Sequence, residues 1–121
     1  MFEVEVARGA ALLDHKNPGW WRAINIGFLD MEKCTRCILG QLYGQYQHGL
    51  NQLEMWESNA ARHGFYVMPP LPSSLPYEEE HMRNWVQANL EWARQWQALG
   101  DAWVTEIERR YKEEAASVSR D

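Results

Sequence analysis

The sequence has few of the features on which secreted and membrane proteins depend. Only two cysteines, Cys34 and Cys37, occur in 121 residues, too few for the disulfide framework of a small secreted domain. The first residues lack the basic segment and apolar run of a signal peptide. No apolar stretch approaches the ~20 residues that a membrane-spanning helix needs. We therefore expect a cytoplasmic protein with no membrane partner.

Basic residues are outnumbered by acidic ones. Twelve Lys and Arg stand against 17 Asp and Glu, which gives a formal net charge of -5 at pH 7. Proteins that bind nucleic acid concentrate Lys and Arg on the surface that meets the phosphates. The charge therefore argues against a nucleic-acid partner, and mild acidity favours solubility.

Patterns that carry catalysis are also missing. No serine lies in a nucleophile elbow, and the glycines occur singly rather than in a phosphate-binding spacing. The run Glu78–Glu80 suits the first turn of a helix, where carboxylates meet the positive end of the helix dipole. We therefore predict no catalytic residue and no cofactor, and we do not expect an enzyme.

The pattern that is present is helical. The length fits one domain, residues 1–121, and apolar spacing predicts helices over 4–15 and 50–63. Asp30 has the side chain of an N-cap and predicts another helix directly after it. A Trp-rich connector, residues 20–28, is expected to cover the core. The sequence thus predicts an all-α or nearly all-α fold, a compact bundle of three to four helices with a long C-terminal helix.

Glycines and a short apolar segment add detail to this outline. Gly40 and Gly44 are four residues apart, hence on one helix face, where they would let another backbone approach closely. Gly49 is expected to break or kink the chain. Residues 65–68 are predicted to form a short extended piece.

The last third of the chain begins with prolines. Residues 69–76 hold four of the five prolines and predict an extended connector; a ligand for a proline-binding domain is the alternative. Residues 77–112 then form one helix or two, depending on whether Gly100-Asp101 interrupts them. The tail, residues 113–121, is expected to fray.

Tryptophans line this final helix. A heptad seam runs through residues that alternate in steps of three and four: Met82, Trp85, Asn89, Trp92, Trp96, Leu99 and Trp103. Packing within the monomer is one interpretation. Asn89 favours another, a homo-oligomer through residues 82–103, because a buried polar seam residue fixes the register between chains. Tryptophan also dominates binding hot spots, and we name Trp85, Trp92 and Trp96 as partner-binding residues.

The two cysteines allow three interpretations. Their spacing puts both sulfurs on one face near a helix start and supplies half of a tetrahedral zinc site. Only His15 and His48 are candidates for the remaining ligands. Redox exchange is a second interpretation, although the lead-in residues of thioredoxin-like proteins are missing. We adopt the third, two buried apolar thiols, and predict no metal ligand.

A resemblance covers residues 9–50. The most specific part is Cys34-x-x-Cys37-Ile38-Leu39-Gly40-Gln41-Leu42-Tyr43-Gly44, preceded by Gly9-Ala10-Ala11-Leu12-Leu13-Asp14 and Pro18-Gly19-Trp20. These residues resemble a group of short proteins of actinobacterial tailed phages and prophages. The resemblance implies a phage origin and no particular activity.

These observations together favour binding over catalysis. We expect a small phage accessory protein that acts in the host cytoplasm by binding another protein, with a host protein as the expected partner. The alternative is a small metal-binding or nucleic-acid-associated regulator that uses Cys34 and Cys37.

Overall fold

The computed structural model describes residues 2–67 and 79–118, with side chains for these residues except 79–88 and 117–118. Within these ranges the chain forms helices and no strand, so the all-α prediction is confirmed. The elements follow in the order α1 (Glu3–Lys16), η1 (Trp20–Ala23), η2 (Ile26–Phe28), α2 (Ile38–Tyr43), α3 (Tyr46–Gln52), α4 (Glu57–Ala60), η3 (Ala61–His63) and α5 (Glu79–Val118), where η marks a 3-10 helix.

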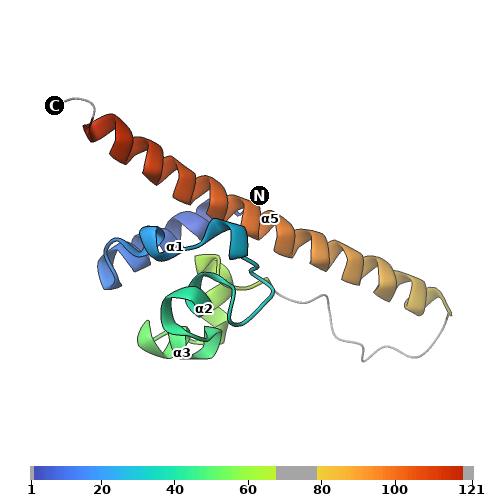
Figure 1. The fold of residues 1–121 in the computed structure, drawn as a ribbon. Coiled ribbons are helices and arrows are strands. Elements are labelled where there is room, and N and C mark those ends of the chain that lie inside the picture. Colours follow the sequence, from blue (N-terminus) through green and yellow to red (C-terminus); the bar gives the residue numbers. More distant parts are fainter. Residues whose placement is uncertain (1, 68–78, 119–121) are drawn as a thin grey trace.

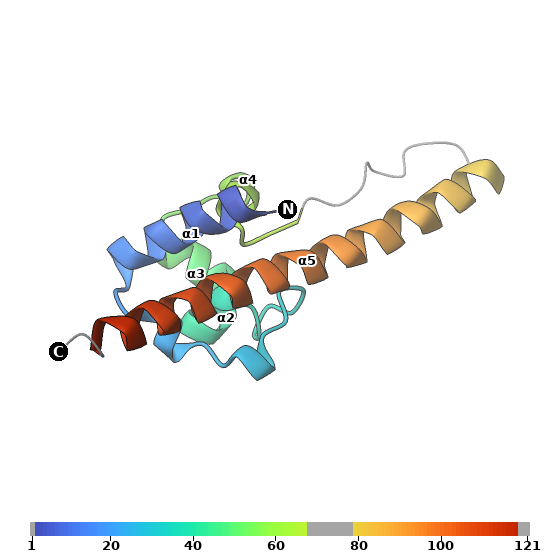
Figure 2. The same cartoon turned by 90° about the horizontal axis from the view of Figure 1, so that it is seen from above.

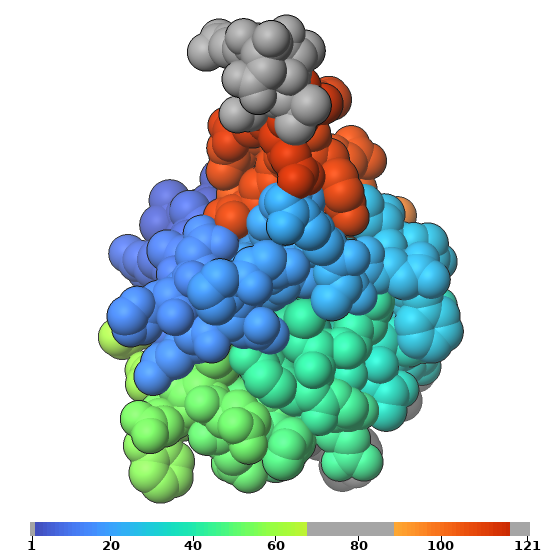
Figure 3. All heavy atoms as spheres, turned by 60° about the vertical axis from the view of Figure 1, so that its left-hand side comes forward, coloured from blue at the N-terminus to red at the C-terminus, as the bar shows by residue number. Residues whose placement is uncertain are grey.

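The first helix and the connector form as expected. Val6, Ala10 and Leu13 are buried along one face of α1, which confirms the apolar spacing. The helix ends at Lys16 with Asn17 as its C-cap, and the connector folds into η1 and η2 and places Trp20 in the core. Figure 3 shows α1 and the connector side by side, between α5 above and the green α3–α4 region below.

The helix predicted after Asp30 begins later, so that prediction is wrong. Asp30 Oδ1 accepts the backbone N–H of Glu32 at 3.1 Å and holds a turn instead. Residues 30–37 remain in turns, and α2 starts only after Cys37, whose Sγ accepts the backbone N–H of Gly40 at 3.2 Å. A side-chain acceptor that satisfies a nearby N–H offers the backbone an alternative to the helix, which explains the shift.

Two glycines determine the shape of this region. A Cβ on Gly40 would lie 2.3 Å from the carbonyl oxygen of Cys34, so the close backbone approach expected there is present. Gly44 has a φ of +93° and ends α2. The break expected at Gly49 is therefore wrong, because Gly49 lies inside α3 and the chain turns at Gly44.

The single helix predicted over residues 50–63 is also wrong. Glu54, with a φ of +55°, separates α3 from α4, and η3 completes the segment up to Gly64. Trp56, expected on the apolar face of that helix, is 78% exposed. Phe65 and Val67 are buried but form no strand, and Met68 lies outside the described residues.

The C-terminal helix is a single element. Gly100 does not interrupt α5, which crosses the body of the molecule and extends beyond it at its amino-terminal end (Figures 1 and 2). Residues 113–118, where fraying was expected, belong to α5, and 119–121 lie outside the described residues. The proline-rich connector, residues 69–76, lies outside them as well.

Trp103 of α5 is at the centre of the core. It is fully buried, and its Nε1 donates to the carbonyl oxygen of Gly64 at 2.6 Å. The ring of Phe65 stacks on it at 5.5 Å, and the Trp20 ring meets it edge-on at the same centroid distance. One side chain of α5 thus joins the connector to the segment after η3.

Candidate partner-binding site

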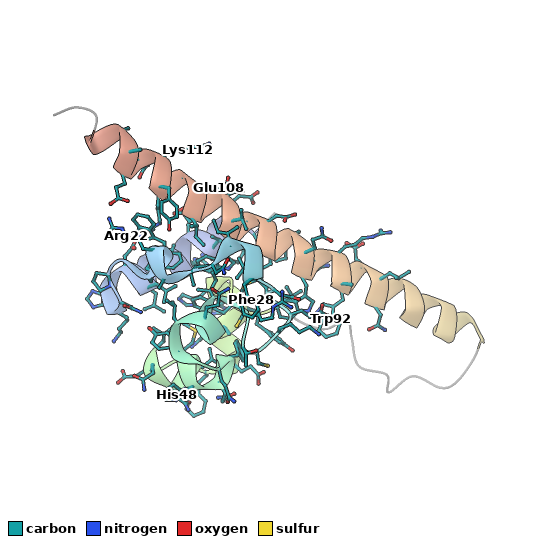
Figure 4. The ribbon with its side chains drawn as sticks, viewed as in Figure 1. Arg22, Phe28, His48, Trp92, Glu108 and Lys112 are labelled. Atoms are coloured by element: carbon teal, nitrogen blue, oxygen red, sulfur yellow. The ribbon has the colours of Figure 1, made fainter. Side chains whose placement is uncertain are left out.

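Two of the three predicted partner-binding residues lie on the face of α5 turned toward the body of the molecule. Trp92 is half-buried on that face, whereas Glu108 and Lys112 lie on the opposite one (Figure 4). Trp96, one turn further along, is only 8% exposed. The side chain of Trp85 lies outside the described residues. The structure therefore brings Trp92 and Trp96 together, with their ring centroids 6.2 Å apart.

Trp92 is held in place by the segment that follows η3. Its Nε1 donates to the carbonyl oxygen of Val67 at 3.0 Å. That hydrogen bond joins residues 25 positions apart and fixes the orientation of the ring. The fold thus fixes the position of the indole.

Two tyrosines that we did not predict as site residues extend this pair into an aromatic cluster. The ring of Tyr66 meets Trp96 edge-on at 5.6 Å, and Tyr46 stacks against Tyr66 at 6.4 Å. Tyr46 begins α3, Tyr66 follows η3, and the tryptophans come from α5. No periodic pattern connects these three segments in the sequence, so only the tertiary fold reveals the cluster.

The aromatic cluster lines a cavity of about 390 Å³, which we call the aromatic cavity. Two carboxylates, Glu32 and Glu57, belong to its lining, as do both cysteines. Its aromatic and apolar wall is formed by Met31, Tyr46, Phe65, Tyr66, Trp92 and Trp96. The cavity thus combines large rings with negative charge.

Two polar atoms in this wall are buried without a hydrogen-bond partner. They are the hydroxyl of Tyr46 and Nε1 of Trp96, and neither has an acceptor or donor in the described part of the chain. Most buried polar groups are paired, and leaving one unpaired costs about 1–3 kcal/mol. Burial raises the pKa of the Tyr46 phenol, and the charge of Glu57 adds to this effect, so the hydroxyl keeps its proton.

A second cavity, of about 550 Å³, shares Met31, Glu32 and Trp96 with the first. It lies between the segment around η2 and α5, and Asp30 and Asp101 add two more carboxylates to its lining. Among the described residues, neither cavity has a Lys, Arg or His in its lining. Both hollows around Trp96 are therefore acidic.

The cysteines differ from each other, which partly corrects the prediction of two buried thiols. Cys37 is buried and caps α2, and burial raises the pKa of its thiol. Cys34 is exposed. His15 and His48 are exposed too, and the described residues contain no group of three or more His, Cys, Asp and Glu side chains that could hold a metal ion.

Trp56 is a further candidate, which helical spacing did not predict. Its side chain is exposed, and it directly precedes Glu57 of the aromatic cavity. An exposed indole suits partner binding, because Trp is enriched among the residues that dominate interface energies. A single helix over residues 50–63, as predicted from the sequence, would place Trp56 on its buried face.

Comparison with known proteins yields no relative. No protein-family model, curated protein or solved structure matches the chain. In the described ranges, none of the helices has the length and hydropathy required to cross a bilayer.

Proposed function

We propose that this protein acts by binding another protein through the aromatic cavity. The observation that carries the proposal is the pair of unpartnered polar atoms, Tyr46 OH and Trp96 Nε1, in a wall made of aromatic rings. Binding sites combine apolar walls with a few placed polar groups. Both atoms are buried, so a partner that displaces the side chains over them and supplies an acceptor to Trp96 and a hydrogen bond to Tyr46 removes the cost of leaving both atoms unpaired.

The rings around these two atoms belong to Trp and Tyr, residue types that contribute much of the binding energy in protein interfaces. Trp and Tyr bury a large area and carry a polar handle, and both are enriched in interface cores. Trp92 is already oriented by its hydrogen bond to Val67, and less side-chain entropy is lost on binding when a ring is pre-organised. Trp56 offers a second, exposed ring next to Glu57.

The biological setting of the proposal comes from the sequence. The resemblance of residues 9–50 to proteins of actinobacterial phages supports an accessory role in the host cytoplasm, with a host protein as the partner. Binding without catalysis is the proposed activity. No observation favours the metal-binding or nucleic-acid-associated alternative, since Cys37 is engaged as a helix cap and the cavities are acidic.

Affinity capture from an actinobacterial lysate tests this function when variants are compared. Trp92→Ala removes one wall of the cavity, and Tyr46→Phe removes only a hydroxyl. Phe28→Ala is the matched control, because Phe28 is 47% exposed and lines neither cavity. Thermal unfolding of each variant establishes that it is folded.

We expect wild type and Phe28→Ala to retain the same co-purifying protein. Trp92→Ala should lose it, and Tyr46→Phe should hold it more weakly, by about 1 kcal/mol for the lost hydrogen bond. Equal capture by all four proteins would exclude the aromatic cavity as the binding site. Capture of nothing by the wild type would contradict the proposed function itself.

A further inference from the structure

We propose that the aromatic cavity binds an arginine side chain presented by the partner. This inference rests on the proposed function and names the chemistry that the cavity recognises. Three features carry it: the charge of the lining, the aromatic rings of its wall, and the two unpartnered polar atoms.

The charge of the lining favours a cation. Glu32 and Glu57 belong to the aromatic cavity, and Asp30 and Asp101 to the cavity beside it, with no basic side chain in either lining among the described residues. Opposite charges at an interface select the partner and speed its association. An acidic or phosphorylated partner segment would meet like charge at this place.

The rings favour a planar cation. Arginine stacks on aromatic faces more often than lysine does, and this chain already shows such contacts elsewhere. Arg22 lies over the ring of Trp21 with its guanidinium 4.6 Å from the ring centroid. Arg36 lies over Phe28 at 4.5 Å, and Arg110 over Trp20 at 5.3 Å. Those arginines come from the chain itself. In the described part of the chain, no such contact involves any of the five aromatic rings that line the cavity.

The unpartnered atoms complete the recognition of a peptide segment. A guanidinium has five N–H donors, and the buried Tyr46 hydroxyl can accept one of them once its ring shifts to expose the oxygen. Trp96 Nε1 only donates, so it suits a main-chain carbonyl beside the arginine. The carboxylates then pair with the remaining guanidinium N–H groups, as Arg and carboxylate do in charge-assisted hydrogen bonds.

Titration with short peptides, followed through the indole N–H signals in two-dimensional NMR spectra, tests the inference. The probes are acetyl-Gly-Arg-Gly-amide and its citrulline analogue, which keeps the shape and loses the charge. Trp92→Phe and Trp96→Phe variants assign the two signals among the seven tryptophans. The double variant Glu32→Gln, Glu57→Gln removes the cavity charges. The double variant Glu54→Gln, Glu108→Gln makes the same change in net charge at exposed residues outside both cavities.

We expect saturable shifts of the Trp92 and Trp96 signals with the arginine peptide, at a Kd on the order of 1 mM. The citrulline peptide should bind at least about fivefold more weakly, as the strength of a cation–π contact and its ion pairs implies. Removing the cavity charges should lower the affinity for the arginine peptide by a similar factor, and the control double variant should leave the Kd of this peptide unchanged.

Three results would overturn the inference. The first is equal affinity for the arginine and citrulline peptides. The second is an equal loss of affinity for the arginine peptide in both double variants, which would show that only the net charge of the protein matters. The third is the absence of any shift of the two signals at about 20 mM peptide, well above a millimolar Kd. If lysate capture still depends on Trp92 after any of these, the proposed function stands and only the arginine specificity fails.

Discussion

Gly40 and Gly100 both lie inside helices, but their surroundings differ. Gly40 packs against the backbone of Cys34 and Thr35, which an added Cβ would approach to 2.3 Å and 2.7 Å. Around Gly100 the nearest atom to an added Cβ is Cγ of Met31, at 3.8 Å. The first glycine is required by close packing, and the second only lowers the helix propensity of α5.

Alanine at these two positions should therefore change stability in opposite directions. Gly40→Ala should lower the free energy of unfolding by at least about 2 kcal/mol, because backbone must move to admit the methyl group. Gly100→Ala should raise it by about 0.5–1 kcal/mol through helix propensity. Urea unfolding followed by circular dichroism measures both. A shift of the same sign in the two variants would show that the described packing around Gly40 is wrong.

At the level of whole elements, one polar contact connects α1 to the far end of α5. Arg110 donates from Nη1 and Nη2 to the two carboxylate oxygens of Asp14 at 2.6 and 2.8 Å. Trp20 Nε1 donates to the same carboxylate at 3.0 Å, and the guanidinium lies over the Trp20 ring. The contact thus joins the first helix, the connector and the last helix.

This contact predicts a dependence of stability on pH. The hydrogen bond from Arg110 holds the pKa of Asp14 below its ordinary value of 3.8. The ionised form is therefore favoured in the folded state, and its contribution is present above the ordinary value and lost as pH falls through the lowered one. Because Asp14 is 45% exposed, we expect a contribution of about 1 kcal/mol or less.

Unfolding of the wild type and Asp14→Asn between about pH 6 and pH 2 measures this contribution. The wild type should be more stable near neutral pH, and the difference should shrink toward zero as the pH falls below the ordinary value. Glu108→Gln, at an exposed position on the outer face of α5, serves as the control for the loss of one surface carboxylate. A stability difference that stays constant over the whole range would show that Asp14 does not act through its charge.

The elements also show what the sequence can and cannot predict. The apolar stripe of α1 was found because it depends only on helical period. The start of α2 was predicted wrongly because two side chains can accept a nearby backbone N–H. Asp30 accepts one inside a turn, and Cys37 accepts one as the N-cap of α2. The sequence alone does not show which of the two acceptors caps the helix, although the close backbone approach at Gly40 was expected.

The candidate site divides in the same way. Trp92 and Trp96 could be predicted because they share a seam on one helix. Tyr46 and Tyr66 could not, because they reach the cavity from two other segments through packing that no local pattern encodes. Trp56 was placed on a buried face because the bend at Glu54 requires a positive φ that Glu rarely adopts.

At the scale of the whole molecule, α5 has two parts with different surroundings. From Trp96 onward its seam is buried within the chain, with Leu99, Trp103 and Ile107 fully covered. Its amino-terminal part extends beyond the body (Figure 2). Much of the predicted heptad seam is therefore buried within the monomer. Trp92, at the boundary between the two parts, is the described seam tryptophan with the most surface left for a partner.

Alanine substitutions along the seam should therefore have graded effects. Trp103→Ala should cost about 3–5 kcal/mol of unfolding free energy, because it leaves a large cavity in the core. It also removes the donor to the Gly64 carbonyl. Trp92→Ala should cost about 1–2 kcal/mol, since the ring is half-buried and makes one hydrogen bond. Leu90→Ala, at a position 52% exposed, should change stability by less than about 0.5 kcal/mol.

Light scattering after size-exclusion chromatography, combined with urea unfolding, completes this test. We expect a monomer for the wild type and for all three variants that fold, because the seam from Trp96 onward is already packed against the body of its own chain. A wild-type dimer that dissociates in Trp92→Ala would instead assign Trp92 to a contact between two copies through residues 82–103. In that case the Trp92 ring would be covered by the second copy, and partner binding at the aromatic cavity would require the dimer to separate first.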